Sequence, residues 1–229
     1  MIFTDSGIVL LRQDFREADR VVALYTQAHG RIHVRVPGVN RSTGKLKAFT
    51  EPFACAEYRI YQRSSSALGT VTGGKINSIF PQIRIHLKRQ IVALHCCELM
   101  MRLTPLRQPN PVKYELLFQA LTSLNTADPL PAFAPAFTLR LMAAAGFGLD
   151  RPVLQISDKF WQRMHEESFE KLICSEPEEL LSLSKCNEVC RRFLNQYLSY
   201  PLQTVKPIGL AEEPTPVAPV AEVSEPLPA

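Results

Sequence analysis

The chain has 229 residues, 46% of them hydrophobic and 21% charged, which suits one or two globular domains with a real core. No run of about 18 uncharged apolar residues occurs, and no basic segment precedes the first apolar stretch, so we expect neither a membrane span nor a signal peptide. The 6 cysteines are sparser than in disulfide-stapled secreted domains, so we expect reduced thiols in a cytoplasm.

Positive charge is concentrated in the first third of the chain. The formal net charge is only +4, but residues 1–80 hold 11 Lys and Arg against 6 Asp and Glu, whereas residues 81–229 hold 15 against 16. Between Asp19 and Glu51 there is no acidic residue, and the basic ones are Arg20, Arg31, Arg35, Arg41, Lys45 and Lys47. Such a stripe is typical of a phosphate-binding surface, although charge alone fits a solvated strand face equally well.

Five β-strands are expected in the first eighty residues, because segments rich in Val, Ile, Thr and Tyr alternate with turn residues. They are Gly7–Arg12, Arg20–Gln27, Arg31–Pro37, Phe53–Arg63 and Leu68–Ile76. A tight turn at His29-Gly30 joins the second strand to the third. Five short strands favour a small closed barrel of the OB type.

Alternation predicts that each strand has one buried face and one wet, mainly basic face. In the third strand the apolar and polar faces are Ile32, Val34 and Val36 against Arg31, His33 and Arg35. In the fourth strand they are Ala54, Ala56, Tyr58 and Ile60 against Glu57, Arg59, Tyr61 and Arg63. Tyr61 is therefore a candidate for stacking on bases, whereas core packing is the expected role of most other aromatic residues in this region.

Helical spacing replaces the strand pattern after Phe80-Pro81. We predict helices at Gln82–Leu103, from the Asn110-Pro111 cap to about Leu124, at Leu130–Ala145 before Gly146, at Glu178–Leu183 and at Glu188–Tyr200. The pattern in residues 149–175 is undecided, and Asp158–Cys174 within it fits a helix or a polar excursion. The predicted architecture is α+β, with an OB-fold nucleic-acid-binding domain at 1–80, an all-α domain at 81–208 and a disordered Pro/Ala/Glu-rich tail at 209–229.

No residue set for catalysis is visible. GVNRSTGKL, at Gly38–Leu46, has the wrong glycine spacing for a phosphate-binding loop of the nucleotide hydrolases and lacks the final Ser or Thr. A Gly/Ser/Thr loop with Arg41, Lys45 and Lys47 suits a sugar-phosphate backbone better. His95-Cys96-Cys97-Glu98 and Cys186-x-x-x-Cys190 are interpreted as buried helix residues rather than metal sites. We expect no enzyme activity and no cofactor.

Four segments follow one another in a recognisable order: GIVLLRQDFREADRVVALYTQAHGRI at Gly7–Ile32, VPGVNRSTGKLKAFTEPF at Val36–Phe53, LRLMAAAGFGLD at Leu139–Asp150 and CRRFLNQYLSYPLQT at Cys190–Thr204. In this order the chain resembles the RecO family over about residues 2–208. The resemblance is strong in the first eighty residues and diffuse afterwards. Many members carry four zinc-binding cysteines after the third segment, but residues 149–173 contain none, so we expect no zinc.

The resemblance implies a non-enzymatic mediator of recombinational DNA repair. It implies binding to single- and double-stranded DNA, annealing of complementary strands, and contacts with RecR and the single-stranded DNA-binding protein that help RecA to load. It also implies a bacterial cytoplasmic protein associated with the nucleoid, with no membrane partner. The candidate DNA-binding residues are Arg20, Arg31, Arg35, Arg41, Lys45, Lys47, Arg59, Tyr61 and Arg63. An RNA-binding OB protein and a protein–protein scaffold are the alternatives, and a nuclease is disfavoured by the missing carboxylate cluster.

Overall fold

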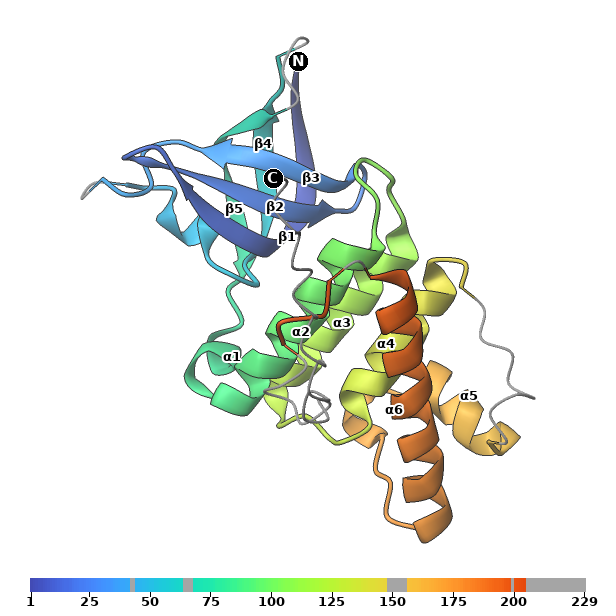
Figure 1. Cartoon of the computed structure of the whole chain (residues 1–229). Coiled ribbons are helices and arrows are strands. Elements are labelled where there is room, and N and C mark those ends of the chain that lie inside the picture. The colour runs from blue at the N-terminus through green and yellow to red at the C-terminus, as the bar shows by residue number, and fades with distance from the viewer. Residues whose placement is uncertain (42–43, 64–67, 148–155, 199, 205–229) are drawn as a thin grey trace, which may run out of the picture.

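The computed structural model describes residues 1–41, 44–63, 68–147, 156–198 and 200–204. A β-barrel forms the first part and helices form the second, so the predicted α+β class is confirmed (Figure 1). The predicted tail at 209–229 and residues 149–155 of the undecided segment lie outside the described residues. No helix among the described residues is long and apolar enough to cross a bilayer.

Five strands close the barrel in the order β1-β2-β3-β5-β4, as expected of an OB-type barrel. Their bounds are β1 Ile2–Phe15, β2 Asp19–Thr26, β3 Gly30–Val36, β4 Cys55–Tyr61 and β5 Gly69–Ser78. The long β1 pairs with β4 through its first half and with β2 through its second half. All pairs are antiparallel except β3 with β5, whose short parallel seam joins Val34 to Gly69 and Arg35 to Thr70.

Alternating side chains fill the barrel, as predicted for β3 and β4. Ile32, Val34 and Val36 of β3 point inward, while His33 between them is exposed. Tyr58 of β4 is fully buried and donates a hydrogen bond from its hydroxyl to the carbonyl of Phe49, at 3.1 Å. The polar end of this large ring is thus satisfied inside an otherwise apolar core.

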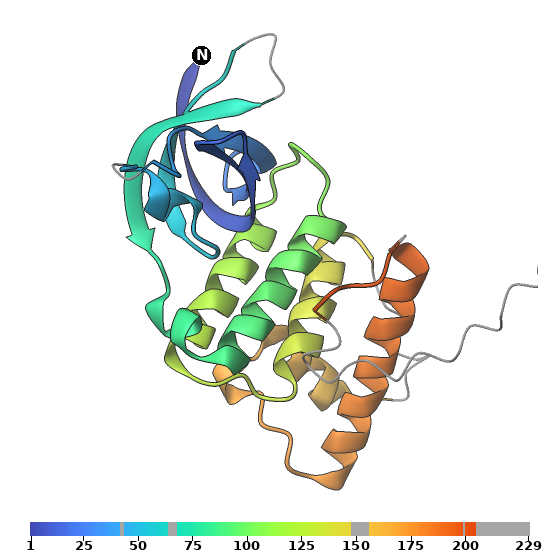
Figure 2. The ribbon, with the colours of Figure 1, turned by 60° about the vertical axis from the view of Figure 1, so that its left-hand side comes forward.

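The outer faces of β1 and β2 are partly buried, although a solvent-exposed outer face was predicted for every strand. Leu10 of β1 and Ala23 and Tyr25 of β2 belong to the same apolar core as the helices. Figure 2 shows the barrel seated on the ends of two helices of the second part. The prediction was wrong here because strand alternation does not reveal that another layer covers the outside of the barrel.

Six α-helices follow among the described residues, and they differ from the prediction mainly in where they break. Their bounds are α1 Pro81–Ile85, α2 Leu87–Leu103, α3 Pro111–Thr126, α4 Phe133–Ala144, α5 Asp158–Glu166 and α6 Pro177–Tyr197, with a 3-10 turn η3 at Phe169–Lys171. The helix predicted from Gln82 divides at His86, which has extended backbone (ψ 111). The two helices predicted near the C-terminus form one helix, α6.

The predicted cap of α3 is confirmed and also links the helices to the barrel. The Asn110 side chain accepts a hydrogen bond from the Lys113 backbone N–H at 3.2 Å, and its amide donates to the carbonyl of Ala144 at 3.3 Å. The Asn110 carbonyl accepts a hydrogen bond from the Tyr25 hydroxyl of β2 at 3.4 Å. One residue therefore ends the α2–α3 loop, starts α3 and contacts the barrel.

The α2–α3 loop lies against the start of β3. The Arg107 backbone N–H donates to the carbonyl of Arg31 at 2.9 Å, so the loop occupies part of the β3 edge that β5 leaves unpaired. Gly30 has φ +66, and a Cβ on it would lie 2.3 Å from the carbonyl oxygen of Gln108. Only glycine fits this turn, both because of its left-handed backbone and because of the loop packed on it.

A short segment after α6, residues 200–204, is anchored on α2. The Glu98 carboxylate accepts hydrogen bonds from the backbone N–H groups of Gln203 and Thr204 and from the Thr204 hydroxyl, at 2.9, 3.0 and 2.7 Å. Because that hydroxyl donates its only proton to Glu98, the His95 Nδ1, 2.9 Å away, must donate to it. The buried His95 Nε2 is then an acceptor without a partner among the described residues.

Acid should loosen this anchor. Burial lowers the pKa of His95 to about 4, with Glu98 acting weakly in the opposite direction. The unfolded chain binds this proton near pH 6.5 and the folded chain does not, so stability falls as pH drops from about 6.5 towards 4, by about 2 kcal/mol between pH 7 and 5. In urea unfolding at both pH values, His95→Gln should lose this part of the decline, with the exposed-site variant His86→Gln as control. An unaltered pH dependence in His95→Gln would contradict the assignment.

Candidate nucleic-acid interface

The outward-facing surface of β3, β5 and β4, which we call the open wall, brings together two candidate residues that lie far apart in sequence. Arg35 of β3 pairs with Thr70 of β5, and Thr70 pairs with Tyr61 of β4, so the three side chains form one outward-facing row. Neighbouring strands are about 4.8 Å apart, so the backbone positions of Arg35 and Tyr61, two strands apart, are about 10 Å from one another. Tyr61 is 45% exposed, as a ring available for stacking would be.

Further cations border this row. Arg59 lies on the same face of β4 as Tyr61 and pairs with Thr4 and with Gly73, which has no side chain to cover it. Arg63 is exposed just beyond the end of β4. Neither residue forms a salt bridge with a carboxylate of the described part of the chain.

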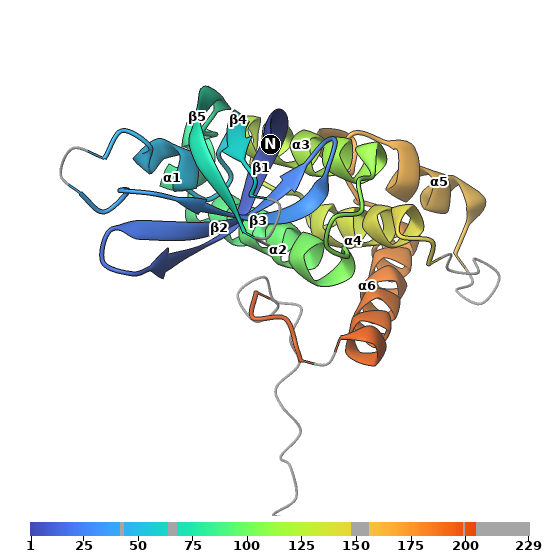
Figure 3. The same cartoon turned by 90° about the horizontal axis from the view of Figure 1, so that it is seen from above.

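The basic loop, which we define as the described residues 37–41 and 44–47, projects from one end of the barrel, on the side away from α5 and α6 (Figure 3). Its first half is held by the β1–β2 turn, since the Gly38 N–H donates to the Asp19 carboxylate at 2.9 Å and the Asn40 N–H to the carbonyl of Ala18 at 3.0 Å. Arg41, Lys45 and Lys47 are exposed, and no carboxylate of the described residues pairs with them. The loop thus carries three exposed cations, and its first half is attached to the β1–β2 turn.

Arg35 links the row to the loop. Its guanidinium lies 3.8 Å from the Asp19 carboxylate and its side chain is 34% exposed. The same carboxylate accepts the hydrogen bond from Gly38 at the start of the basic loop. Because the ion pair is long and partly hydrated, Arg35 keeps donors for another anion.

Arg20 lies elsewhere, in a cluster that stabilises the fold. Its side chain is 14% exposed and donates to the Asp14 carboxylate at 2.9 Å and to the Thr50 hydroxyl at 3.1 Å, so Arg20 is a structural partner of Asp14. This hydrogen bond lowers the pKa of Asp14. The Glu51 carboxylate forms salt bridges with Arg12 at 2.7 Å, Arg84 at 3.3 Å and Arg20 at 3.7 Å. These ion pairs link β1 and β2 to α1.

Arg31 also points away from the open wall. Its guanidinium donates to the carbonyl of Met101, near the end of α2, at 2.8 Å, and its Nε is buried with no partner in the described part of the chain. Burial lowers its pKa, and no carboxylate pairs with it among the described residues. Arg20 and Arg31 stay predictions as DNA ligands, but we leave both out of the interface because their side chains serve contacts within the protein.

Sequence reasoning missed two basic positions on the open wall. His33 is exposed two residues before Arg35, on the polar face that alternation had defined but not assigned a role. Lys75 of β5 is exposed and pairs across the sheet with Glu57. A register between β4 and β5 would have been needed to find Lys75, and no turn signal in the sequence fixes that register.

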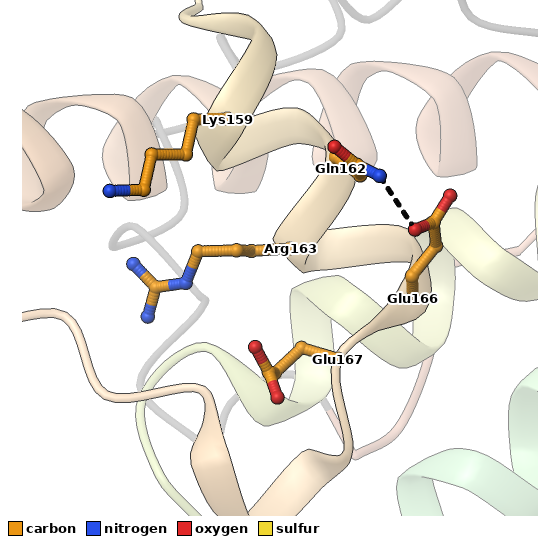
Figure 4. A pocket seen from close by; sticks show the side chains of 5 residues that line it. All are labelled: Lys159, Gln162, Arg163, Glu166 and Glu167. Carbon is orange, nitrogen blue, oxygen red and sulfur yellow. Dashed lines mark hydrogen bonds between the residues drawn. The ribbon is translucent and has the colours of Figure 1, made fainter.

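Other parts of the described structure offer little chemistry. No group of three or more His, Cys, Asp or Glu side chains lies close enough to hold a metal ion within the described residues. A shallow hollow beside α5 is lined by Lys159, Gln162, Arg163, Glu166 and Glu167 (Figure 4). In it Gln162 donates to Glu166 at 2.9 Å, while Arg163 pairs with Glu179 outside it. The charged groups that line the hollow are of both signs and are exposed or half-buried, and we assign them no site.

Fold and surface together define an OB-type barrel with a basic outer wall, joined to a helical part. The family model "Recombination protein O N terminal" matches residues 1–80, and "Recombination protein O C terminal" matches residues 85–151. The chain belongs to the RecO family, as its resemblance in sequence had suggested.

Curated relatives named "DNA repair protein RecO" support the assignment. One from Listeria monocytogenes serotype 4b (strain CLIP80459) is 31% identical over 140 residues, covering 61% of this chain and 54% of the relative. One from Bacillus pumilus (strain SAFR-032) is 35% identical over 125 residues, covering 55% and 48%. One from Geobacter metallireducens is 31% identical over 141 residues, covering 62% and 57%. The matched part of the chain thus spans about half the length of these relatives.

Proposed function

We infer that this protein is a non-enzymatic mediator of recombinational DNA repair that binds single- and double-stranded DNA and anneals complementary strands. The observation that carries this proposal is a set of exposed cations on the basic loop and on the open wall of the barrel that pair with no carboxylate of the described residues: Arg41, Lys45, Lys47, Arg59 and Arg63. Membership in the RecO family supports DNA as the polyanion.

The proposed mechanism is electrostatic. Two complementary strands repel each other through their phosphates, and cations that neutralise those phosphates release condensed counterions and lower the barrier to pairing. One strand follows the basic loop onto the row of Arg35 and Tyr61, where a base stacks on the tyrosine ring and its pairing edge stays accessible. The second strand meets a phosphate backbone whose charge is partly offset.

Family membership also supports the proposed partners. RecR and the single-stranded DNA-binding protein are proposed as direct contacts, and RecA as an indirect one that is loaded through them. These contacts are proposed for the whole protein and have no assigned residues.

A strand-annealing assay with the purified chain tests the proposal. Two complementary fluorescent oligonucleotides should pair faster with the protein than without it, and the acceleration should fade as salt rises and screens the phosphates. The assay is repeated with one strand coated by a single-stranded DNA-binding protein. Annealing of RNA strands of the same sequence is measured in parallel, to test whether DNA is the preferred nucleic acid. Faster annealing of RNA than of DNA, or no acceleration of either, would overturn the proposal.

Substitution of Tyr61 tests base stacking separately from phosphate neutralisation, because it changes no charge. Tyr61→Ala should weaken single-stranded DNA binding about tenfold, because stacking on an aromatic side chain contributes about 1–3 kcal/mol per base. The slope of log affinity against log salt should stay the same, since no cation is lost. Tyr61→Phe keeps the ring and should bind like the parent in a fluorescence anisotropy titration. Equal losses in both variants would show that the hydroxyl, and not stacking, matters.

A further inference from the structure

The described part of the chain ends at an anchored point close to the barrel. Thr204 is fixed to Glu98 and His95 on α2. Met101, whose carbonyl accepts a hydrogen bond from Arg31 of the barrel, follows His95 by six residues on the same helix. Six residues of α-helix rise about 9 Å, so the chain leaves its anchor less than two turns of helix from the barrel.

The sequence that follows this anchor is acidic. Residues 205–229 contain four glutamates, Glu212, Glu213, Glu222 and Glu225, and one basic residue, Lys206. The nine residues from Thr204 to Glu213 can span at most about 30 Å when extended. The first two carboxylates are therefore tethered no more than about 30 Å from the anchor, and the later two have a longer tether.

The barrel offers a matching surface. Most arginines near the junction with the helices are already paired with carboxylates, as Arg12, Arg20 and Arg84 are around Glu51. The cations of the basic loop, and Arg59 and Arg63 beside Tyr61, have no such partner among the described residues. An acidic segment tethered nearby has a high effective concentration at this surface.

We propose that residues 205–229 occupy the basic surface of the barrel when no DNA is bound and compete with DNA for it. This inference rests on the proposed function and adds regulation of the same surface. A long strand supplies many phosphates and displaces four tethered carboxylates, whereas a short oligonucleotide competes poorly. The segment thus raises the length of DNA that the protein needs for stable binding.

The test compares three proteins: the full chain, a chain ending at Thr204, and the full chain with Glu212, Glu213, Glu222 and Glu225 replaced by glutamine. Affinity for a short single-stranded oligonucleotide is measured by fluorescence anisotropy across salt. Both altered proteins should bind about three- to tenfold more tightly than the full chain at low salt, and the difference should vanish at high salt, where exposed charges are screened. A long strand should show a smaller difference.

The outcomes separate this inference from the proposed function. Equal binding by all three proteins leaves the proposed function intact and overturns the competition. Binding by none of them overturns the proposed function itself. Tighter binding after truncation but not after the glutamine changes would overturn the electrostatic form of the inference. A fourth protein combines the truncation with Arg41→Ala, Lys45→Ala and Lys47→Ala. If the segment acts on the loop, truncation should give a smaller gain in this background.

Discussion

Replacing Arg41, Lys45 and Lys47 together by alanine should weaken single-stranded DNA binding on the order of 100-fold at 0.1 M salt. Each phosphate contact contributes about 0.7 to the slope of log affinity against log salt, so losing three contacts should flatten the slope by about 2. The two proteins should bind similarly near 1 M salt. At 0.1 M, a tenfold lower concentration, a slope that is flatter by about 2 makes the affinity of the variant about 100-fold lower. Double-stranded DNA should show a slightly larger change, because its slope per contact is about 0.9.

The matched control removes three exposed charges from the far helices. Lys159, Lys171 and Arg192 lie on α5, η3 and α6, away from the basic loop (Figure 3). Changing these three to alanine alters the net charge by the same amount and should leave the slope almost unchanged. Circular dichroism checks that both triple variants are folded. Similar slopes in the two variants would mean that the loop does not hold phosphates and that only the total charge matters.

Gly30→Ala should destabilise the protein by about 3 kcal/mol or more. The left-handed backbone at this position costs a non-glycine residue roughly 1–2 kcal/mol, and the new methyl group would also overlap the carbonyl of Gln108, which lies 2.3 Å from the added Cβ. Relief requires the α2–α3 loop to move away from the barrel, which would also strain the Arg107–Arg31 hydrogen bond. Urea unfolding followed by fluorescence or circular dichroism measures the change in the free energy of unfolding.

Gly146→Ala separates the two contributions to that loss. Gly146 also has a left-handed backbone, with φ +86, but a Cβ there would meet no atom within 4 Å. This variant should therefore lose only the conformational part, roughly 1–2 kcal/mol. If both variants lost the same stability, the close contact between Gly30 and the loop would contribute nothing.

The barrel could be predicted from the sequence because its strands alternate and its turns are marked. In β3 and β4 the inward residues Val34, Tyr58 and Ile60 stand at every second position between polar residues. The ends of the helices were harder to place. The break at His86 carries neither Gly nor Pro, and its extended backbone is accompanied by contacts of the neighbouring Arg84 with Glu51 and the carbonyl of Pro52. Such long-range contacts leave no local signal.

The candidate interface was predictable in part, for a related reason. The basic loop was predictable because the sequence around Arg41 contains cations and no acidic residue, and Arg41, Lys45 and Lys47 are exposed as expected. Arg31 alternates with Ile32 as an outward residue should, but the surface it faces is the end of α2. Alternation says which side of a strand a residue is on and does not say what lies there.

The short parallel seam between β3 and β5 determines how the protein can be dissected. Because the α2–α3 loop bonds to the edge of β3 beside that seam, a fragment limited to residues 1–80 would expose unpaired backbone groups there. It would also uncover the apolar surface formed by Leu10, Ala23 and Tyr25. Unpaired strand edges and exposed apolar patches promote self-association. Fragments intended for solution work should therefore retain the chain at least through α3.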